Sequence, residues 1–256
     1  MNLKFLISLA ITLTLIWALN RSWEIGSIRI PPPGKFLDPA HGFWQNIEPK
    51  GFSLPESLNI PGFQQPVMVA FDSIMIPHIF AQNDEDLYLA QGYITAFHRL
   101  WQMEFQTHAA AGRLAEILGS GPDDAILSYD RTQRRLGMVY AAENAYRGME
   151  KDPVAKMVAG KYAEGINTYI QSLSYRDLPL EYKILDYKPE EWTMLKSALL
   201  LRSMAQTLNS GDKDIQMTNA LKLFGKEMID VLYPDREPMG DPIVDKAGKW
   251  DFEPAH

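Results

Sequence analysis

The sequence contains no cysteine among its 256 residues. This absence excludes disulfide bonds, thiolate-bound zinc and cysteine nucleophiles. The chain also lacks an excess of positive charge, because 32 acidic side chains outnumber 25 basic ones and give a formal net charge of −7. A broad basic surface is what attracts a phosphate backbone, so the charge balance argues against nucleic acid as a partner.

Short motifs of well-known catalytic sites are missing as well. The sequence has no G-x-S-x-G elbow, no phosphate loop and no H-E-x-x-H. Metal-ligand spacing is absent among the five histidines, which are His41, His78, His98, His108 and His256. We interpret His98 as a surface or hydrogen-bonded side chain. The pairs Asp123–Asp124 and Glu190–Glu191 are interpreted as solvated charges or helix-start residues, because adjacent helical residues do not face each other. Arg113 and Glu116, three residues apart, are expected to pair.

The composition is that of a folded protein, with 46% hydrophobic and 22% charged residues. At the N-terminus, Lys4 precedes an apolar run from Phe5 to Leu19. A run of roughly 15 residues suits a signal-peptide core and is short for a membrane span of ~20. No clear small-residue cleavage pattern follows, so an uncleaved anchor stays open. We therefore interpret residues 1–21 as a signal peptide or signal anchor, and expect a periplasmic or secreted protein, with membrane anchoring as the alternative.

Periodicity predicts one hairpin and several helices after a linker and covering segment at residues 22–66. In that segment, Pro31–Gly34 is expected to be an extended spacer. The hairpin strands are Val67–Phe71 and Ile76–Phe80, with Asp72 and Ser73 in the turn. A long helix is expected from a cap at Asp84 to about Ala110, interrupted at Gly112. Further helices are expected at Asp130–Arg147, Pro153–Ser172, Glu190–Thr207 and Asp214–Phe224, the last with a stop at Gly225. Residues 234–256 are rich in proline, glycine and charge, and are expected to be a linker or the start of a spacer peptide.

Several blocks within residues 67–233 stand in the order typical of one enzyme family. The densest is Arg99-Leu100-Trp101-Gln102-Met103-Glu104, and others are Ile76–Ala81, Gly92-Tyr93, Gly112–Gly119, Tyr162–Asn167 and the Pro189-x-x-Trp192 step. In these blocks the chain resembles the penicillin acylase family of N-terminal-nucleophile hydrolases, which includes penicillin, cephalosporin and N-acyl homoserine lactone acylases. Residues 67–233 are thus expected to form a domain like the leading, alpha chain of these enzymes.

Two departures from the family pattern fall in this domain. His98 stands where the family usually has an aspartate before the Arg-Leu-Trp-Gln-Met block. Met75 and Ile76 stand where it usually has glycine before a Val-Pro-His step. Both departures are interpreted as structural.

The resemblance implies an α+β fold: the predominantly helical leading portion of an αββα sandwich, with a short β-hairpin. It also implies a mechanism in which a precursor cuts itself and frees an N-terminal serine on a second chain. That serine attacks a linear amide while its own α-amino group accepts the proton. No catalytic residue is expected in these 256 residues, and Asn209-Ser210-Gly211 is only a short look-alike of the junction. The expected partner is the serine-headed catalytic beta chain of the same precursor, and the expected ligand is an acyl amide.

The family's acyl-pocket positions map onto Met204, Thr207 and Leu208. Penicillin acylases carry arginine and phenylalanine at the last two places, so the resemblance implies a flexible aliphatic acyl group here. Helix core is the alternative for Met204 and Leu208. A structural calcium ligand of the family maps onto Asp214, although one carboxylate cannot supply the six to eight oxygens that calcium takes, and Asp214 is equally suited to capping a helix.

A second interpretation belongs to another class of protein. The chain would then be a non-catalytic, membrane-anchored remnant or interaction protein that retains the family's leading half. An open frame or neighbouring gene for a serine-headed chain would distinguish the enzyme from this alternative.

Overall fold

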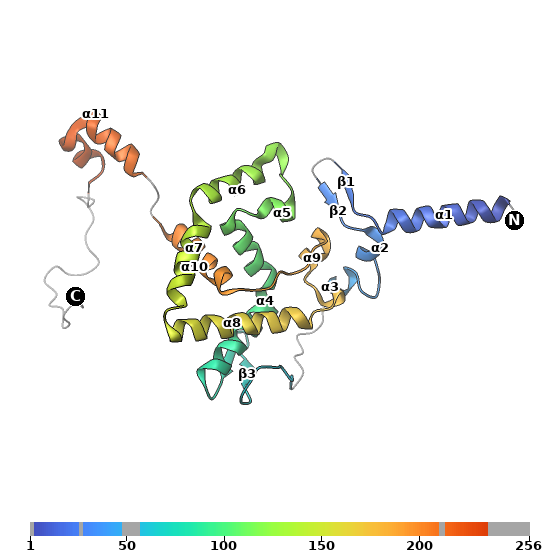
Figure 1. Ribbon diagram of the computed structural model, residues 1–256. Helices are drawn as coiled ribbons and strands as arrows, with labels where there is room; N and C mark the ends of the chain where they lie inside the picture. The colour runs from blue at the N-terminus through green and yellow to red at the C-terminus, as the bar shows by residue number, and fades with distance from the viewer. Residues whose placement is uncertain (1–2, 26–27, 48–56, 210–212, 235–256) are drawn as a thin grey trace. The chain divides into compact units, whose positions relative to one another are not determined.

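The computed structural model describes residues 3–25, 28–47, 57–209 and 213–234, and helices make up most of it (Figure 1). The chain divides into two units, Met1–Leu208 and Asn209–His256, which we describe separately. The described β-structure consists of two antiparallel two-stranded hairpins. The expected fold class, mostly helical with little strand, is confirmed, although the sequence predicted one hairpin rather than two.

The first described helix, α1 (Leu3–Leu19), buries none of its side chains. A small hairpin of β1 (Trp23–Ile25) and β2 (Ile28–Ile30) follows it. Among the described helices, none combines the length and apolarity needed to cross a membrane. The proline run was wrongly predicted as an extended spacer, because α2 (Pro33–Phe36) begins inside it. Proline at a first helical position loses no hydrogen bond and already has the helical φ angle.

The covering segment after α2 is partly helical and is held by a buried lysine. It contains α3 (Trp44–Ile47), while residues 48–56 lie outside the described part. The buried Nζ of Lys183 donates to the carbonyl oxygen of Gly42 at 3.1 Å and to Oδ1 of Asn46 at 2.7 Å. All three lysine donors are used, because Nζ also donates to the Arg176 carbonyl at 2.9 Å. A buried ammonium group is tolerated only with such partners, so this contact fixes the segment on the domain.

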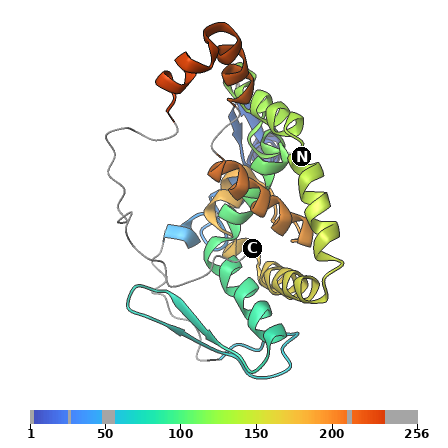
Figure 2. The same ribbon diagram turned by 90° about the vertical axis from the view of Figure 1, so that its left-hand side faces the viewer.

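The predicted hairpin is confirmed as β3 (Met68–Phe71) paired with β4 (Pro77–Phe80). Its register places Met68 opposite Phe80 and Phe71 opposite Pro77. β4 packs against α4, Phe71 next to the turn contacts His98 of α4, and the turn beyond them projects away from the helices (Figure 2). The turn spans residues 72–76, so it is longer than the predicted Asp72–Ser73.

The long helix α4 (Asp84–Ala111) crosses α8 (Pro153–Ser172), and this crossing forms the centre of the first unit (Figure 1). A Cβ atom added at Gly92 would overlap the Tyr162 carbonyl, and one at Gly165 would overlap the Leu89 carbonyl. Glycine is therefore required at both positions for the two backbones to approach. The predicted cap was one residue off: the Asn83 side chain, not Asp84, accepts from the Asp86 N–H. Gly112 ends α4 with φ +65°, as expected for a left-handed cap.

Shorter helices complete the first unit. They are α5 (Leu114–Leu118), η1 (Pro122–Asp124), α6 (Ala125–Arg135), α7 (Met138–Met149), η2 (Tyr175–Asp177), α9 (Leu180–Leu185) and α10 (Met194–Leu208). The single helix predicted at Asp130–Arg147 is wrong, because Gly137 with φ +71° separates α6 from α7. The helix predicted at Pro153–Ser172 is confirmed with the same bounds.

The second unit contains α11 (Asp214–Leu232). Gly225, predicted as a stop, breaks the helical backbone with φ +75°, but helical structure resumes beyond it to Leu232. The predicted end at Phe224 is therefore correct for the first part of the helix and wrong for the whole.

Candidate functional site

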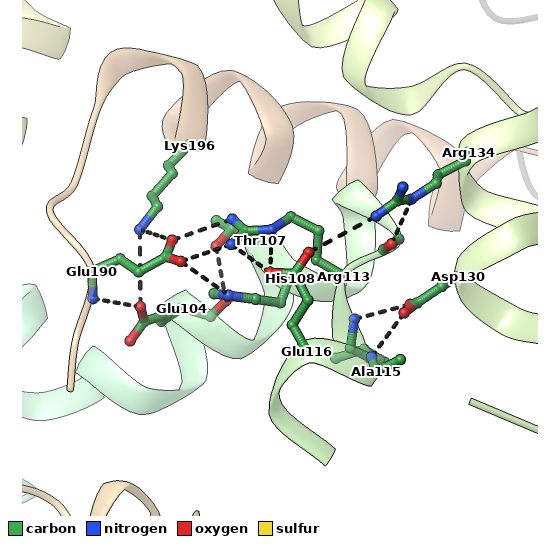
Figure 3. Close-up of polar contacts among 12 residues, drawn as sticks. Glu104, Thr107, His108, Arg113, Ala115, Glu116, Asp130, Arg134, Glu190 and Lys196 are labelled. Atoms are coloured by element: carbon green, nitrogen blue, oxygen red, sulfur yellow. Dashed lines mark hydrogen bonds and ion pairs between the residues drawn. The ribbon is translucent and has the colours of Figure 1, made fainter. Parts of the chain in front are cut away.

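A partly buried group of charged side chains lies between α4 and the start of α10 (Figure 3). We call it the Glu104–Glu190 cluster; its members are Glu104 and His108 of α4, Arg113 of the following turn, Glu190 of the extended segment before α10, and Lys196 of α10. Glu104 and His108 are one helical turn apart, so they share a face. The cluster thereby joins two parts of the chain, residues 104–113 and 190–196, that are distant in sequence.

Glu104 is the buried anchor of this cluster. Its Oε1 accepts the backbone N–H of Glu190 at 2.7 Å, and its Oε2 accepts the hydroxyl of Tyr182. Burial raises the pKa of Glu104, while the hydrogen bonds from Tyr182 and Glu190 and the charge of Lys196 act in the opposite direction. Burial also raises the pKa of Tyr182, which therefore stays protonated and donates. The carboxylate thus fixes the backbone at Glu190.

Glu190 is held by two cations. Arg113 donates to both of its carboxylate oxygens, at 2.7 and 3.3 Å, and Nζ of Lys196 lies 3.1 Å from Oε2. The hydrogen bond from Arg113 lowers the pKa of Glu190 to about 2. Arg113 also binds Glu116 at 2.7 Å, so the predicted Arg113–Glu116 pair is confirmed. The interpretation of Glu190 as a solvated charge is wrong, because two cations pair with it in the folded chain. The residues next to Glu190 in the sequence give no sign of these partners.

Three members of the cluster have the ligand types of a metal site. One ligand atom from each of Glu104, His108 and Glu190 lies within 4.8 Å of the others. However, the oxygens of Glu190 already face Arg113 and Lys196, so a divalent cation would have to enter beside two positive charges. The Nδ1 of His108 also faces the backbone carbonyl of Glu104 at 3.0 Å. The arrangement is therefore that of an ion-pair network that fixes α10 on α4.

The segment before α10 is extended because side chains bind its backbone. The predicted helix start at Glu190 is wrong; α10 begins at Met194. Glu104 takes the N–H of Glu190, and Asn167 both accepts the N–H of Trp192 at 2.7 Å and donates to its carbonyl at 2.9 Å. The Trp192 side chain is buried, and its indole N–H donates to Ser197 at 3.0 Å. The Pro189-x-x-Trp192 step thus anchors the N-terminal end of α10.

The predicted pocket residues lie at the other end of α10. Met204 and Leu208 are one helical turn apart and are 58% and 77% exposed. The exposed Leu201, one turn before Met204, lies on the same face of the helix. The alternative interpretation of Met204 and Leu208 as helix core is therefore wrong for the part of the chain that the structure describes. Thr207 is also exposed, and its hydroxyl donates to the Ser203 carbonyl of its own helix at 3.0 Å. We call Leu201, Met204 and Leu208 the α10 stripe.

Asp214, the predicted calcium ligand, is the first residue of α11 in the second unit. The N-cap position belongs to Lys213, so the alternative of Asp214 as the helix cap is wrong. A carboxylate in a first turn still interacts favourably with the helix dipole. Within residues 3–25, 28–47, 57–209 and 213–234, the structure contains one group of three or more possible metal ligands, and Asp214 is not a member of it. This carboxylate alone offers at most two of the oxygens that calcium needs.

The remaining sequence predictions concern histidines and the look-alike serine. The exposed ring of His98 makes edge-on contacts with Phe97 and with Phe71, the last residue of β3, so it is a surface side chain near the turn end of the hairpin strands. Ser210 and His256 lie outside the described residues. Sequence reasoning missed the Glu104–His108 pair, although its four-residue spacing on the apolar face of a helix was visible.

Comparisons with known proteins agree on one family. Residues 66–249 match the family model described as Penicillin amidase. The chain is 36% identical over 157 residues to the penicillin acylase 2 proenzyme of Pseudomonas sp. (strain SE83), covering 61% of this chain and 19% of that protein. It is 32% identical over 181 residues to the acyl-homoserine lactone acylase QuiP of Pseudomonas aeruginosa, covering 69% of this chain and 20% of that protein. The chain therefore spans about a fifth of the length of these curated relatives.

A solved structure gives the same result. The thermostable penicillin G acylase from Alcaligenes faecalis superposes with a TM-score of 0.61 and 26% sequence identity. The match covers 72% of this chain and 99% of that chain. The matched part of this chain thus has the fold of nearly one whole polypeptide chain of that enzyme structure.

Proposed function

Because the chain belongs to the penicillin amidase family, we propose that it is the leading, alpha-chain part of an amidohydrolase that cleaves a linear acyl amide. Two observations support this role. The chain accounts for 99% of a single chain in the solved penicillin G acylase, yet for only about a fifth of the curated relatives. One of those relatives is named a proenzyme, which fits a product that is cut into chains.

In the proposed reaction, the nucleophile is a serine at the N-terminus of the second chain of the same precursor. Its hydroxyl attacks the amide carbonyl while its α-amino group accepts the proton, which later passes to the leaving amine. An α-amino group titrates at about pH 7.7–8.0, so it is an effective base near neutral pH. Hydrogen-bond donors then stabilise the tetrahedral oxyanion. The part of the chain described here supplies none of these groups in this proposal; it binds the acyl group.

The α10 stripe is the observation that carries the pocket proposal. Its apolar side chains are exposed at one end of a helix whose other end is fixed by Trp192 and the Glu104–Glu190 cluster. A rigid helix with an exposed apolar row is suited to form one wall of a binding site. We assign Met204, Thr207 and Leu208 to that wall. Thr207 and Leu208 offer neither an aromatic ring nor a charge, which favours a flexible aliphatic acyl chain over a phenylacetyl group. The amine released would be a homoserine lactone or a β-lactam nucleus.

Reconstitution tests this function. The full chain is co-expressed with the serine-headed chain of its precursor, and hydrolysis is measured on N-acyl homoserine lactones and penicillins. A stable, correctly processed complex that hydrolyses none of these amides would contradict the proposal.

The variant Leu208→Phe tests the pocket wall. It adds aromatic bulk and should shift the ratio of kcat/KM values between aliphatic and phenylacetyl substrates toward the phenylacetyl substrates. Leu223→Phe on α11 changes a leucine of the same 77% exposure and serves as the matched control. Equal ratios in both variants would place Leu208 outside the pocket.

A structural calcium ion is a separate proposal. Asp214 would contribute one carboxylate, and the second chain would contribute the remaining oxygens. Calcium should then raise the Tm of the two-chain form, and Asp214→Ala should abolish that rise. Equal calcium stabilisation of the wild type and the variant would remove Asp214 from the ligands.

We also propose that residues 1–21 direct export to the periplasm or beyond, as a signal peptide or signal anchor. The apolar side chains of α1 support this, because none of them is buried in the core of the first unit. N-terminal sequencing of the mature protein from separated membrane and soluble fractions distinguishes cleavage from anchoring. An uncleaved protein in the soluble cytoplasmic fraction would contradict both.

The alternative of a non-catalytic interaction protein has no specific observation in its favour. The absence of any gene for a serine-headed chain would favour this alternative.

A further inference from the structure

The turn of the β3–β4 hairpin exposes three consecutive large apolar side chains. Ile74 is 74% exposed, and Met75 and Ile76 are 40% and 49% exposed. These residues, which we call the hairpin tip, project away from the helices of the first unit (Figure 2). Single exposed apolar residues are common on protein surfaces, but a contiguous group on a projecting turn marks a contact site.

The tip is ordered by hydrogen bonds of its own. Oδ1 of Asp72 accepts the N–H groups of Ile74 and Ile76, at 3.0 and 2.9 Å. The Met75 N–H donates to the Asp72 carbonyl at 3.0 Å, and the Asp72 N–H donates to the Ile76 carbonyl at 3.2 Å. Because the backbone is already fixed, docking of the tip would lose little conformational entropy.

Met75 is held in a conformation that its side chain disfavours. Its φ angle is +68°, in the left-handed region that glycine adopts without cost. Glycine would satisfy this turn, yet the chain places a long apolar side chain there. A strained, exposed side chain at a fixed turn is explained if that side chain is buried in a complex.

We propose that the hairpin tip is a plug that inserts Ile74, Met75 and Ile76 into an apolar recess of the remaining polypeptide of the same precursor. The proposal rests on the two-chain function above. The occupant follows from the length of the relatives: they extend over about five times the matched length, so under the proposed two-chain function a large partner surface would be part of the same gene product. The charge of the turn also matters, because its one ionic side chain, Asp72, is occupied by backbone N–H groups and lies 3.6 Å from His78.

Other occupants are less suited to this tip. An anionic membrane surface attracts basic side chains, and the turn carries an acidic one. A second copy pairing through the strand edge would meet Pro77 in β4, which has no N–H to donate. The tip is therefore assigned to the interior of a partner polypeptide rather than to lipid or to a copy of itself.

Photo-crosslinking tests the assignment in the native host. The full chain carries benzoylphenylalanine at position 74 or, as a control, at Val154, which is 66% exposed on α8. We expect a crosslink from position 74, but not from position 154, to peptides encoded by the remainder of the same precursor. A crosslink to a second copy or to lipid, or none at all, would overturn the proposal.

A double variant measures the strength of the contact. Because both side chains are exposed, Ile74→Ser with Ile76→Ser should leave the Tm of the isolated chain unchanged. It should lower the amount of co-purifying second chain about tenfold, which is a moderate effect for removing two buried aliphatic contacts. The matched control is Val154→Ser with Tyr140→Ser, also exposed, which should co-purify as the wild type does. Equal yields in both variants would overturn the proposal.

Failure of this proposal can be separated from failure of the proposed function. An active two-chain enzyme without a crosslink from position 74 would remove only the plug. A chain that neither yields amide hydrolysis nor has a second chain in its host would remove both.

Discussion

Glu190 links the turn after α4 to the start of α10, because its carboxylate pairs with both Arg113 and Lys196. Its pKa of about 2 lies below the ordinary value of 4.5, chiefly because of the hydrogen bond from Arg113. A depressed carboxyl pKa contributes stability that is fully present above pH 4.5 and is lost as the pH falls toward 2. The stabilisation should be about 1–2 kcal/mol, less than a fully buried pair would give, since 38% of the side chain is exposed to screening solvent.

Replacing Glu190 with glutamine should therefore destabilise the chain at pH 7 and have a smaller effect at pH 3. Urea unfolding of the wild type and the variant between pH 7 and pH 3 measures this difference. Glu191→Gln, at the adjacent exposed position, is the control and should follow the wild type throughout. A Glu190→Gln deficit that stays constant with pH would show that its charge is not the cause.

Met75→Gly should stabilise the isolated chain by about 0.5–1 kcal/mol. The left-handed φ angle of Met75 costs a side chain ~1–2 kcal/mol, and glycine avoids this cost while adding ~0.5–1 kcal/mol of unfolded-state entropy. Thermal unfolding measures the change. The control is Met68→Gly, in a strand where glycine brings no relief and should destabilise. A lower Tm for Met75→Gly would mean that the side chain is stabilising where it is.

Whether a side-chain contact could be predicted from the sequence depended on how far apart its two residues lie in the chain. The Arg113–Glu116 pair was predictable because its members are three residues apart. Glu190 was misinterpreted because its partners, Arg113 and Lys196, are brought to it by tertiary folding. Met75 replaces a glycine expected from the family resemblance, and the positive φ angle now explains why glycine suits that position.

At the scale of elements, the crossing of α4 and α8 depends on Gly165. Alanine there would place its methyl group on the Leu89 carbonyl, which is backbone and cannot rotate away. Gly165→Ala should therefore cost about 1–3 kcal/mol of unfolding free energy through overpacking. The control is Gly160→Ala in the same helix, where an added Cβ meets no atom within 4 Å. It should stabilise by up to about 1 kcal/mol through helix propensity. Urea unfolding of both variants measures the contrast, and equal effects would contradict the close approach.

The helices themselves were predicted unevenly, for local reasons. The bounds of α8 were correct because Asp152 caps it and Pro153 occupies its first position. The break between α6 and α7 was missed because Gly137 alone gives a weak signal within an amphipathic stretch. The late start of α10 was not predictable from local sequence, since Glu104 and Asn167, distant in the chain, take the backbone groups of residues 190–192.

At the scale of the whole molecule, the hydrophobic core differs from the proposed pocket wall in whether the described chain itself covers the apolar side chains. The side chains of Trp192, Tyr182 and Ile166 are buried within the first unit by other residues of that unit. The α10 stripe and the hairpin tip, in contrast, expose apolar side chains that the described chain does not cover. Sequence blocks predicted the family and the helical fold, but exposure could only be learned from the structure.

The full chain, purified alone, should hydrolyse neither an N-acyl homoserine lactone nor a penicillin. The proposed reaction needs a serine whose own α-amino group is free, because that amine with a pKa of about 7.7–8.0 is the base. When the serine-headed chain is supplied, kcat/KM should appear and should rise with pH through this range, since the amine must lose its proton before it can accept one. A serine-headed chain extended by one N-terminal residue removes the base at the serine and is the control; it should assemble but remain inactive. Amide hydrolysis by the isolated chain, or by the extended complex, would contradict the assignment of the nucleophile to a second polypeptide.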